Sequence, residues 1–321
     1  MPEGLDAPGR SAYFCDMTRF LIPVFALAVS PLQAGIEVEK DGNNLKVLVD
    51  GKLFTEFRSD ASSPCLYPLM SPSGTHLTRQ FPFVKGVEGE QTDHIHHVGF
   101  WLTHGAINGK DFWHSKKGEK IVCKGFVGEP EASGDSAKFT VDVAWEVDGK
   151  AVMTEQRSYE IAASGKTRTI DVTSTFKPAD GDVTFGDTKE GFFAIRVAPT
   201  LRLKGAVAKG SITTSAGNND SAAWGKRAKW VAYHGPDSAG TETVVAILDH
   251  KDNLRHPTGW HARDYGLLTA NPFAVRSFRM KGDGAHTIKA GESLTQRYQL
   301  VLHQGDFESA KIEERWGDFT K

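Results

Sequence analysis

The sequence contains few cysteines and little excess charge of either sign. Only three of its 321 residues are cysteine, and the formal net charge is −2 at pH 7. No C-x-x-C pair is present, so we expect no cysteine-bound zinc. Cys65 and Cys123 are expected either to form one disulfide or to remain buried thiols. A nearly neutral chain offers no basic surface to a phosphate backbone, so we expect no nucleic-acid partner.

Three common catalytic motifs are also missing from the chain. It has no G-x-S-x-G nucleophile turn, no Walker phosphate loop and no G-x-G-x-x-G after a strand. These absences argue against a serine hydrolase, a nucleoside triphosphatase and a dinucleotide-dependent enzyme.

The one long apolar run lies near the N-terminus. An uncharged stretch from Phe20 to Leu32 follows a basic residue and leads to the small residue Ala34. This pattern is typical of a secretory signal peptide. We expect residues 1–34 to be a leader, with translation starting at Met17. Residues 35–321 would then be a periplasmic or extracellular protein without a membrane span.

Short alternating runs separated by turn residues make up most of the remaining chain. Hairpin dipeptides occur at Asp50-Gly51, Asn108-Gly109 and Asp148-Gly149, and each suits the left-handed backbone of a tight turn. The alternation predicts strands within residues 44–57, 138–161, 167–177, 192–203, 242–250, 265–273 and 296–304.

Helical periodicity is confined to residues 306–316, where Asp306 is the expected cap. We therefore predict an all-β fold, a large antiparallel β-sandwich or a barrel, with a short C-terminal helix. No linker or internal repeat divides the chain, so residues 35–321 are expected to form one domain.

Four segments break the alternating pattern: residues 66–82, 93–113, 188–199 and 256–273. Each places charged or polar residues among aromatic rings, glycine and proline. Sugars are bound in this way, because rings cover their C–H faces while polar groups bond their hydroxyls. We predict that the four segments converge on one cleft.

Four histidines, His94, His96, His97 and His104, lie close together in the second segment. If residues 93–99 are extended, His94 and His96 share one face. Cupin barrels present two metal ligands at this spacing, although they place a Glu where this chain has Phe100. A divalent metal on His94 and His96 is one hypothesis. The other is that these are polar residues bonded to backbone groups.

The catalytic candidates are Glu190, His94, His261 and Asp264. Glu190 lies at the start of an apolar strand, where a carboxyl group is suited to proton transfer; the alternative is an exposed carboxylate paired with Lys189 or Arg196. Asp264 either orients His261 or pairs with Arg263. The substrate-binding candidates, chosen to bond sugar hydroxyls or to stack on a ring, are Arg79, His96, Trp101, Arg196, Trp260, Arg263 and Asn271.

Taken together, the four segments resemble a family of bacterial proteins that carries the label "methane oxygenase PmoA". The matching elements are "YPLMSPSGTHLTRQFP", "DHIHHVGFWLTHGAINGKDFW", "KEGFFAIRVA" and "GWHARDYGLLTANPF". The resemblance implies a fold similar to the galactose-mutarotase-like sandwich and an association with carbohydrate use. In that architecture a His acts as acid and a Glu as base in a sugar cleft. The methane oxygenase subunit of this name has several membrane-spanning helices, and this sequence has none.

The expected function is a secreted carbohydrate-active enzyme of the mutarotase, epimerase, lyase or hydrolase type. Glu190 and one of His94, His96 or His261 would exchange protons with a sugar or glycoside. One alternative is a metal-dependent oxygenase or lyase, with His94, His96 and a third ligand from His97, His104, His234 or His261. Another is a carbohydrate-binding module without catalysis.

Overall fold

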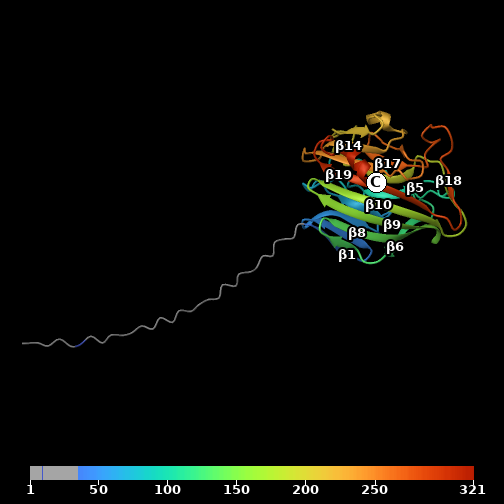
Figure 1. Cartoon of the computed structure of the whole chain (residues 1–321), viewed down its shortest axis with the longest axis horizontal. Coiled ribbons are helices and arrows are strands. Elements are labelled where there is room, and N and C mark those ends of the chain that lie inside the picture. The colour runs from blue at the N-terminus through green and yellow to red at the C-terminus, as the bar shows by residue number, and fades with distance from the viewer. Residues whose placement is uncertain (1–8, 10–34) are drawn as a thin grey trace, which may run out of the picture. The chain divides into compact units, whose positions relative to one another are not determined.

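The computed structural model describes residue 9 and residues 35–321, so the predicted leader falls almost entirely outside the described residues. The described chain is mainly antiparallel β-sheet, with 47% strand and one short C-terminal helix (Figure 1). The prediction of an all-β sandwich is therefore confirmed. No helix among the described residues is long and apolar enough to cross a membrane.

Two large sheets make up the sandwich. The first has eight strands in the order β1 (Ile36–Asp41), β2 (Asn44–Val49), β3 (Lys52–Arg58), β4 (Cys65–Leu69), β5 (Phe100–His104), β12 (Gly191–Arg196), β17 (Leu267–Asn271) and β16 (Gly259–Trp260). The second has nine in the order β13 (Ser211–Thr214), β14 (Trp230–Pro236), β15 (Glu242–Asp249), β19 (Leu294–Gln304), β10 (Thr167–Pro178), β9 (Lys150–Ser164), β8 (Ser136–Val147) and β6 (Glu119–Phe126), with β7 (Glu131–Ser133) beside β8.

Smaller elements complete the fold. Strands β11 (Val183–Phe185) and β18 (His286–Ile288) pair with each other, and two 3-10 turns occupy Pro199–Leu201 and Asp220–Ala223. The tight hairpins expected from the sequence are present. Both residues of each dipeptide have positive φ, for example 53° at Asp50 and 70° at Gly51, as a two-residue turn requires.

The core lies between the two sheets and follows from the alternation along each strand. In β10, Ile170, Val172 and Phe176 are buried, while the residues between them are half exposed or bear hydroxyls. Phe193 of β12 stacks on Tyr298 of β19 with ring centroids 4.6 Å apart, which shows the two sheets in face-to-face contact. Buried residues of both sheets belong to one contiguous core cluster.

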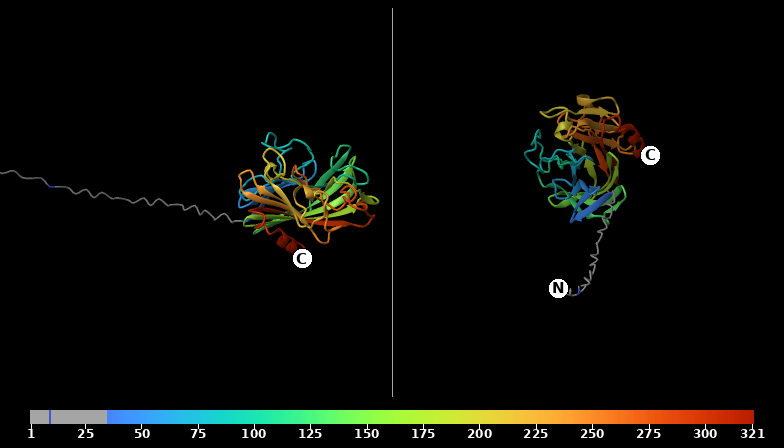
Figure 2. Two further views of the ribbon diagram at one scale, coloured as in Figure 1. Left: turned by 90° about the horizontal axis from the view of Figure 1, so that it is seen from above. Right: turned by 90° about the vertical axis from the view of Figure 1, so that its left-hand side faces the viewer.

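The C-terminal helix starts later than expected. Helix α1 spans Ile312–Phe319, because Lys311 has a left-handed φ of 51° that interrupts the backbone before it. Asp306 instead closes a preceding turn, where its Oδ1 accepts the N–H of Ser309 at 2.7 Å. The helix packs Ile312 and Trp316 against the outer face of β14, β15 and β19, so it lies outside the sandwich (Figure 2).

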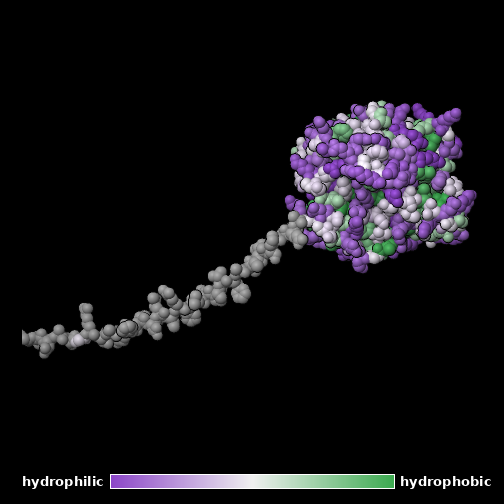
Figure 3. Space-filling view, viewed as in Figure 1, coloured by the Kyte–Doolittle hydropathy of each residue, from purple (hydrophilic) through white to green (hydrophobic). Residues whose placement is uncertain are grey.

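The structure also shows the state of the two cysteines and the polarity of one face of the molecule. Cys65 and Cys123 are both buried and unpaired, so the disulfide alternative is wrong. The face seen in Figure 3 is mainly hydrophilic with small, separate hydrophobic areas, which gives no broad apolar patch on that side.

The outer face of the eight-stranded sheet is covered by long loops rather than by a helix. The segment between β4 and β5, and the one after β5, lie over this face. Beneath them, Trp101 of β5 and Leu267 of β17 form a small second core with Tyr67 and Trp113. The strands thus provide a rigid floor, and the loops above it form the candidate site.

Candidate functional site

A cavity of about 300 Å³ opens on this loop-covered face. Its wall is built from His94, His97, Trp113, His114, Lys189, Glu190, His261, Arg263 and Tyr265. Three of the four atypical segments therefore meet in one cavity. The fourth, residues 66–82, contributes Arg79, which lies behind the wall.

The histidine segment is a turn, and the expectation of an extended strand over residues 93–99 is wrong. His94 has a φ of 46°, and the N–H of His97 donates to its carbonyl at 3.0 Å. The rings of His94 and His97 stack at 4.7 Å, while the ring of His96 contacts that of His114 at 4.6 Å. His94 and His96 consequently do not share the face of a strand.

Arg79 holds this turn through hydrogen bonds. Its guanidinium donates to the carbonyls of Asp93 and His94, both at 2.8 Å, and to the Asp93 carboxylate at 2.9 Å. The side chain is only 2% exposed. Arg79 was expected to contact substrate, but its donors are used to hold the loop. Burial and the neighbouring Arg196 lower its pKa to about 10.

Arg196 is likewise a support for the loop rather than a substrate ligand. It donates to Nδ1 of His97 at 3.0 Å and to the Asp93 carboxylate at 3.3 Å, and it is buried. Burial alone would raise the pKa of Asp93, but Arg196, His94 and Arg79 together bring it below its ordinary value. Asp93 therefore stays ionised and neutralises part of the charge of two buried arginines.

His97 lines the cavity and keeps one ring N–H without a partner within residues 35–321. Because its Nδ1 accepts from Arg196, the proton must sit on Nε2, and that buried atom has no partner among the described residues. Burial, followed by the nearby His96 and Arg196, lowers the pKa of His97, so the ring is neutral. It stacks on Trp101 at 5.3 Å. Trp101 is only 2% exposed, which makes it a floor beneath His97 rather than a sugar platform.

His261 is a second neutral imidazole in the wall. Its Nδ1 donates to the carbonyl of Lys189 at 3.1 Å, which leaves Nε2 as a hydrogen-bond acceptor. Burial, reinforced by Lys189 and Arg263, lowers the pKa of His261 to about 3. At neutral pH this ring carries no charge, and its Nε2 is available to accept a hydrogen bond.

Two histidines of the wall are each oriented by an aspartate. Nδ1 of His94 lies 2.7 Å from the Asp93 carboxylate, and Nδ1 of His114 lies 2.7 Å from that of Asp111. In each pair the carboxylate accepts the Nδ1 proton, so Nε2 is the ring nitrogen that the aspartate leaves free.

Glu190 occupies the cavity wall as a partly exposed carboxylate paired with Lys189. The pairing with Lys189 is one of the two named in the sequence alternative, and Arg196 is not the partner of Glu190. The backbone carbonyl of Glu190 accepts the N–H of Gly105 at 2.7 Å. A Cβ at position 105 would lie 2.9 Å from that of Glu190, so glycine allows this close approach.

Three further candidates serve other purposes than those expected. Asn271 is buried and bonds the carbonyl of Thr188 at 3.0 Å, so it supports the Glu190 segment from behind. Trp260 is fully buried in the main core and donates to a backbone carbonyl at 2.9 Å. Asp264 pairs with Lys204 at 3.0 Å, and therefore neither orients His261 nor pairs with Arg263.

The structure gives no geometric support to a metal site. Within residues 35–321, no three His, Cys, Asp or Glu side chains are arranged to hold a metal ion. His104 ends β5 and bonds the carbonyl of Gly186 at 2.9 Å, and His234 bonds Thr213 on the other sheet. Burial and the adjacent His114 lower the pKa of His96 to about 3.

Four residues of the wall were not among the sequence candidates: Trp113, His114, Lys189 and Tyr265. Trp113 and His114 closely follow the Asn108-Gly109 hairpin, which returns the chain to the cavity. Tyr265 alternates with His261 and Arg263, and its ring stacks on His94 at 5.7 Å. The hairpin could have identified Trp113 and His114, and the two-residue period could have identified Tyr265.

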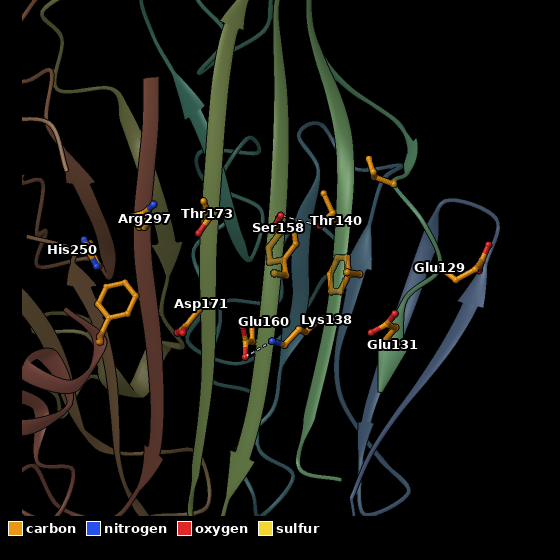
Figure 4. Close-up of a pocket in the computed structure, with 14 residues that line it drawn as sticks. Glu129, Glu131, Lys138, Thr140, Ser158, Glu160, Asp171, Thr173, His250 and Arg297 are labelled. Atoms are coloured by element: carbon orange, nitrogen blue, oxygen red, sulfur yellow. Dashed lines mark hydrogen bonds and ion pairs between the residues drawn. The ribbon is translucent and has the colours of Figure 1, made fainter. Parts of the chain in front are cut away.

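A larger hollow of about 640 Å³ lies on the outer face of the nine-stranded sheet (Figure 4). Its polar groups pair with one another across strands, as Lys138 does with Glu160 at 3.0 Å. Burial raises the pKa of Asp171 there to about 6, despite a hydrogen bond from Gln299. No buried polar atom in its lining lacks a partner, whereas His97 and Arg263 in the smaller cavity each have one. The smaller cavity is therefore the better candidate for chemistry.

Fold and site together define a two-sheet β-sandwich protein with a histidine-rich cavity on one outer face. The chain belongs to the family described as "Family of unknown function (DUF6807)", whose model matches residues 44–317. This range includes every residue of the cavity wall. A search of curated proteins finds no match.

Proposed function

We propose that this protein is a carbohydrate-active enzyme that transfers protons at a sugar or glycoside bound in the histidine-rich cavity. The convergence of His94, His114, His261 and Glu190 on one cavity carries the proposal. These side chains offer ring nitrogens and a carboxylate to one bound molecule, which is what acid/base catalysis requires.

The other groups of the wall suit a sugar. The aromatic residues Trp113 and Tyr265 stand in the wall among polar and charged side chains, a mixture that suits a sugar-sized ligand. A volume of about 300 Å³ is at the small end of ligand pockets, so it matches a single sugar unit. The remainder of a glycoside would extend into solvent.

Each group has a distinct part in the proposed chemistry. Nε2 of His94 takes up a proton while Asp93 holds the ring through Nδ1, and Glu190 is the second proton-transfer group. His261, with a pKa of about 3, is a poor acid at neutral pH and instead accepts a hydrogen bond from a hydroxyl.

The large sandwich of two antiparallel sheets is in keeping with a galactose-mutarotase-like architecture. On that basis we infer that the reaction belongs to the mutarotase, epimerase, lyase or hydrolase type. Export by a cleaved leader, inferred from the sequence, would place this activity outside the cytoplasm.

The test is turnover on a panel of monosaccharides and glycosides by wild type, Glu190→Gln, His94→Gln and the control His250→Gln. His250 lines the larger hollow, so its replacement should leave turnover unchanged. The two cavity variants should lose about 10²-fold to 10⁴-fold in rate and still bind the sugar.

Two results would contradict the proposal. Loss of turnover in His250→Gln but not in His94→Gln would indicate that the active site is the larger hollow on the nine-stranded sheet. Sugar binding by wild type without turnover of any panel member would identify a binding module instead.

A further inference from the structure

Arg263 differs from the other arginines of residues 35–321 that are not exposed. Each of those donates at least one side-chain hydrogen bond to a carboxylate, a carbonyl or a ring nitrogen. Arg263 is half buried, and within the described residues its guanidinium has neither a salt bridge nor a hydrogen bond. Its Nε is buried without a partner. The guanidinium of Arg263 is thus a positive charge in the cavity wall that is not paired with any group of the described residues.

The carboxylates around Arg263 are already engaged. Glu190 pairs with Lys189, Asp264 pairs with Lys204, and Asp93 is bound by two buried arginines. Asp111 pairs with His114. The charged side chains of the wall itself are Lys189, Arg263 and Glu190, an excess of one positive charge. The lowered pKa values of His97 and His261 keep those rings neutral, so they do not change this balance at neutral pH.

The position of Arg263 is set by its surroundings. Its backbone carbonyl accepts a hydrogen bond from the buried hydroxyl of Tyr233, and its guanidinium carbon lies 5.3 Å from the centre of the Tyr265 ring. Stacking on an aromatic ring restrains the plane of a guanidinium and leaves its edge nitrogens available. The fixed fork of N–H donors matches a planar carboxylate, which it binds through two parallel hydrogen bonds.

We propose that Arg263 binds the carboxylate of an acidic sugar, so that the cavity takes a hexuronate or a glycoside ending in one. This proposal rests on the proposed function, since it specifies which sugar the cavity holds. A neutral hexose would fill the same space but leave the partly buried cation without a counter-charge. The carboxylate supplies that charge, and the sugar ring then lies in the cavity beside the proton-transfer groups.

The experiment compares calorimetric binding of three ligands with the same ring: methyl glucuronide, methyl glucoside and methyl glucoside 6-sulfate. The proteins are wild type, Arg263→Gln, Arg263→Lys and the control Arg276→Gln, whose side chain is exposed and paired with Asp283. Thermal unfolding of each variant confirms that it is folded.

Wild type should bind the glucuronide about tenfold to a hundredfold more tightly than the glucoside, as expected for charge-assisted hydrogen bonds. Arg263→Gln should lose that preference and keep the glucoside affinity. Arg263→Lys should retain part of it, because a lysine keeps the charge but lacks the planar fork. The control should behave as wild type.

The outcomes separate this inference from the proposed function. Equal wild-type affinity for glucuronide and glucoside, unchanged in Arg263→Gln, would overturn the acidic-sugar inference and leave a sugar enzyme standing. Tighter binding of the sulfate ester than of the glucuronide would also overturn it, in favour of a tetrahedral anion. Failure of wild type to bind any of the three would overturn both proposals.

Discussion

His104 provides a direct link between a buried side chain and the pH dependence of stability. It ends β5 with no exposed surface, and its ring packs against Phe273 at 5.0 Å. Burial lowers the pKa of His104 from 6.5 to about 4, although the bond to the Gly186 carbonyl acts in the opposite direction. In the unfolded chain the ring titrates near its ordinary value.

The sign follows from which state binds the proton. Between pH 6.5 and about 4, the unfolded chain holds a proton on His104 and the folded chain does not. Acid therefore favours unfolding in this window, and the stability due to the neutral ring is fully present only above it. For a shift of this size the loss is about 2 kcal/mol between pH 7.5 and pH 5.

The assay is urea unfolding of wild type, His104→Gln and Phe273→Leu across this pH range. Glutamine keeps an N–H donor for Gly186 but does not titrate, so the free energy of unfolding of His104→Gln should fall by about 2 kcal/mol less than that of wild type. Phe273→Leu disturbs the same packing without removing a titratable group, and its curve should stay parallel to that of wild type. Parallel curves for His104→Gln and wild type would refute the reasoning.

Three further predictions concern the core, the leader and the metal alternative. Trp260→Ala should destabilise the protein by about 3–5 kcal/mol, because it empties a fully buried site. Trp260→Phe should stay folded, and its sugar affinity measured by calorimetry should equal that of wild type. Weaker binding in this variant would instead support the substrate-binding role predicted for Trp260 from the sequence. Intact-mass analysis of exported protein should give an N-terminus at Gly35, and retention of residues before Ala34 would contradict the leader. Dialysis against a chelator should leave turnover unchanged; loss of activity with a bound metal, abolished by His94→Ala with His96→Ala, would favour the metal-dependent alternative.

The sequence by itself determined the strands, the tight hairpins and the all-β class. These depend on local properties: Asp50-Gly51 and Asn108-Gly109 adopt positive φ at little cost, and alternation along β10 buries every second residue. It also identified His94, Glu190, His261 and Arg263 as candidate site residues, because they lie in segments where polar groups among aromatic residues interrupt the alternation of a strand. All four lie in the cavity wall.

Only the tertiary structure decided what each polar or aromatic residue contacts. Residues 93–97 form a turn whose carbonyls accept hydrogen bonds from the buried Arg79, a contact that the local pattern of residues 93–99 does not reveal. Trp101, Trp113 and Trp260 are all buried, at 2% exposure or less, and of the three only Trp113 lines the cavity, since the covering of a strand face depends on loops and on the second sheet. The neutral state of His97 and His261 follows first from burial, which the local sequence does not reveal, and only then from charged neighbours near and far in sequence.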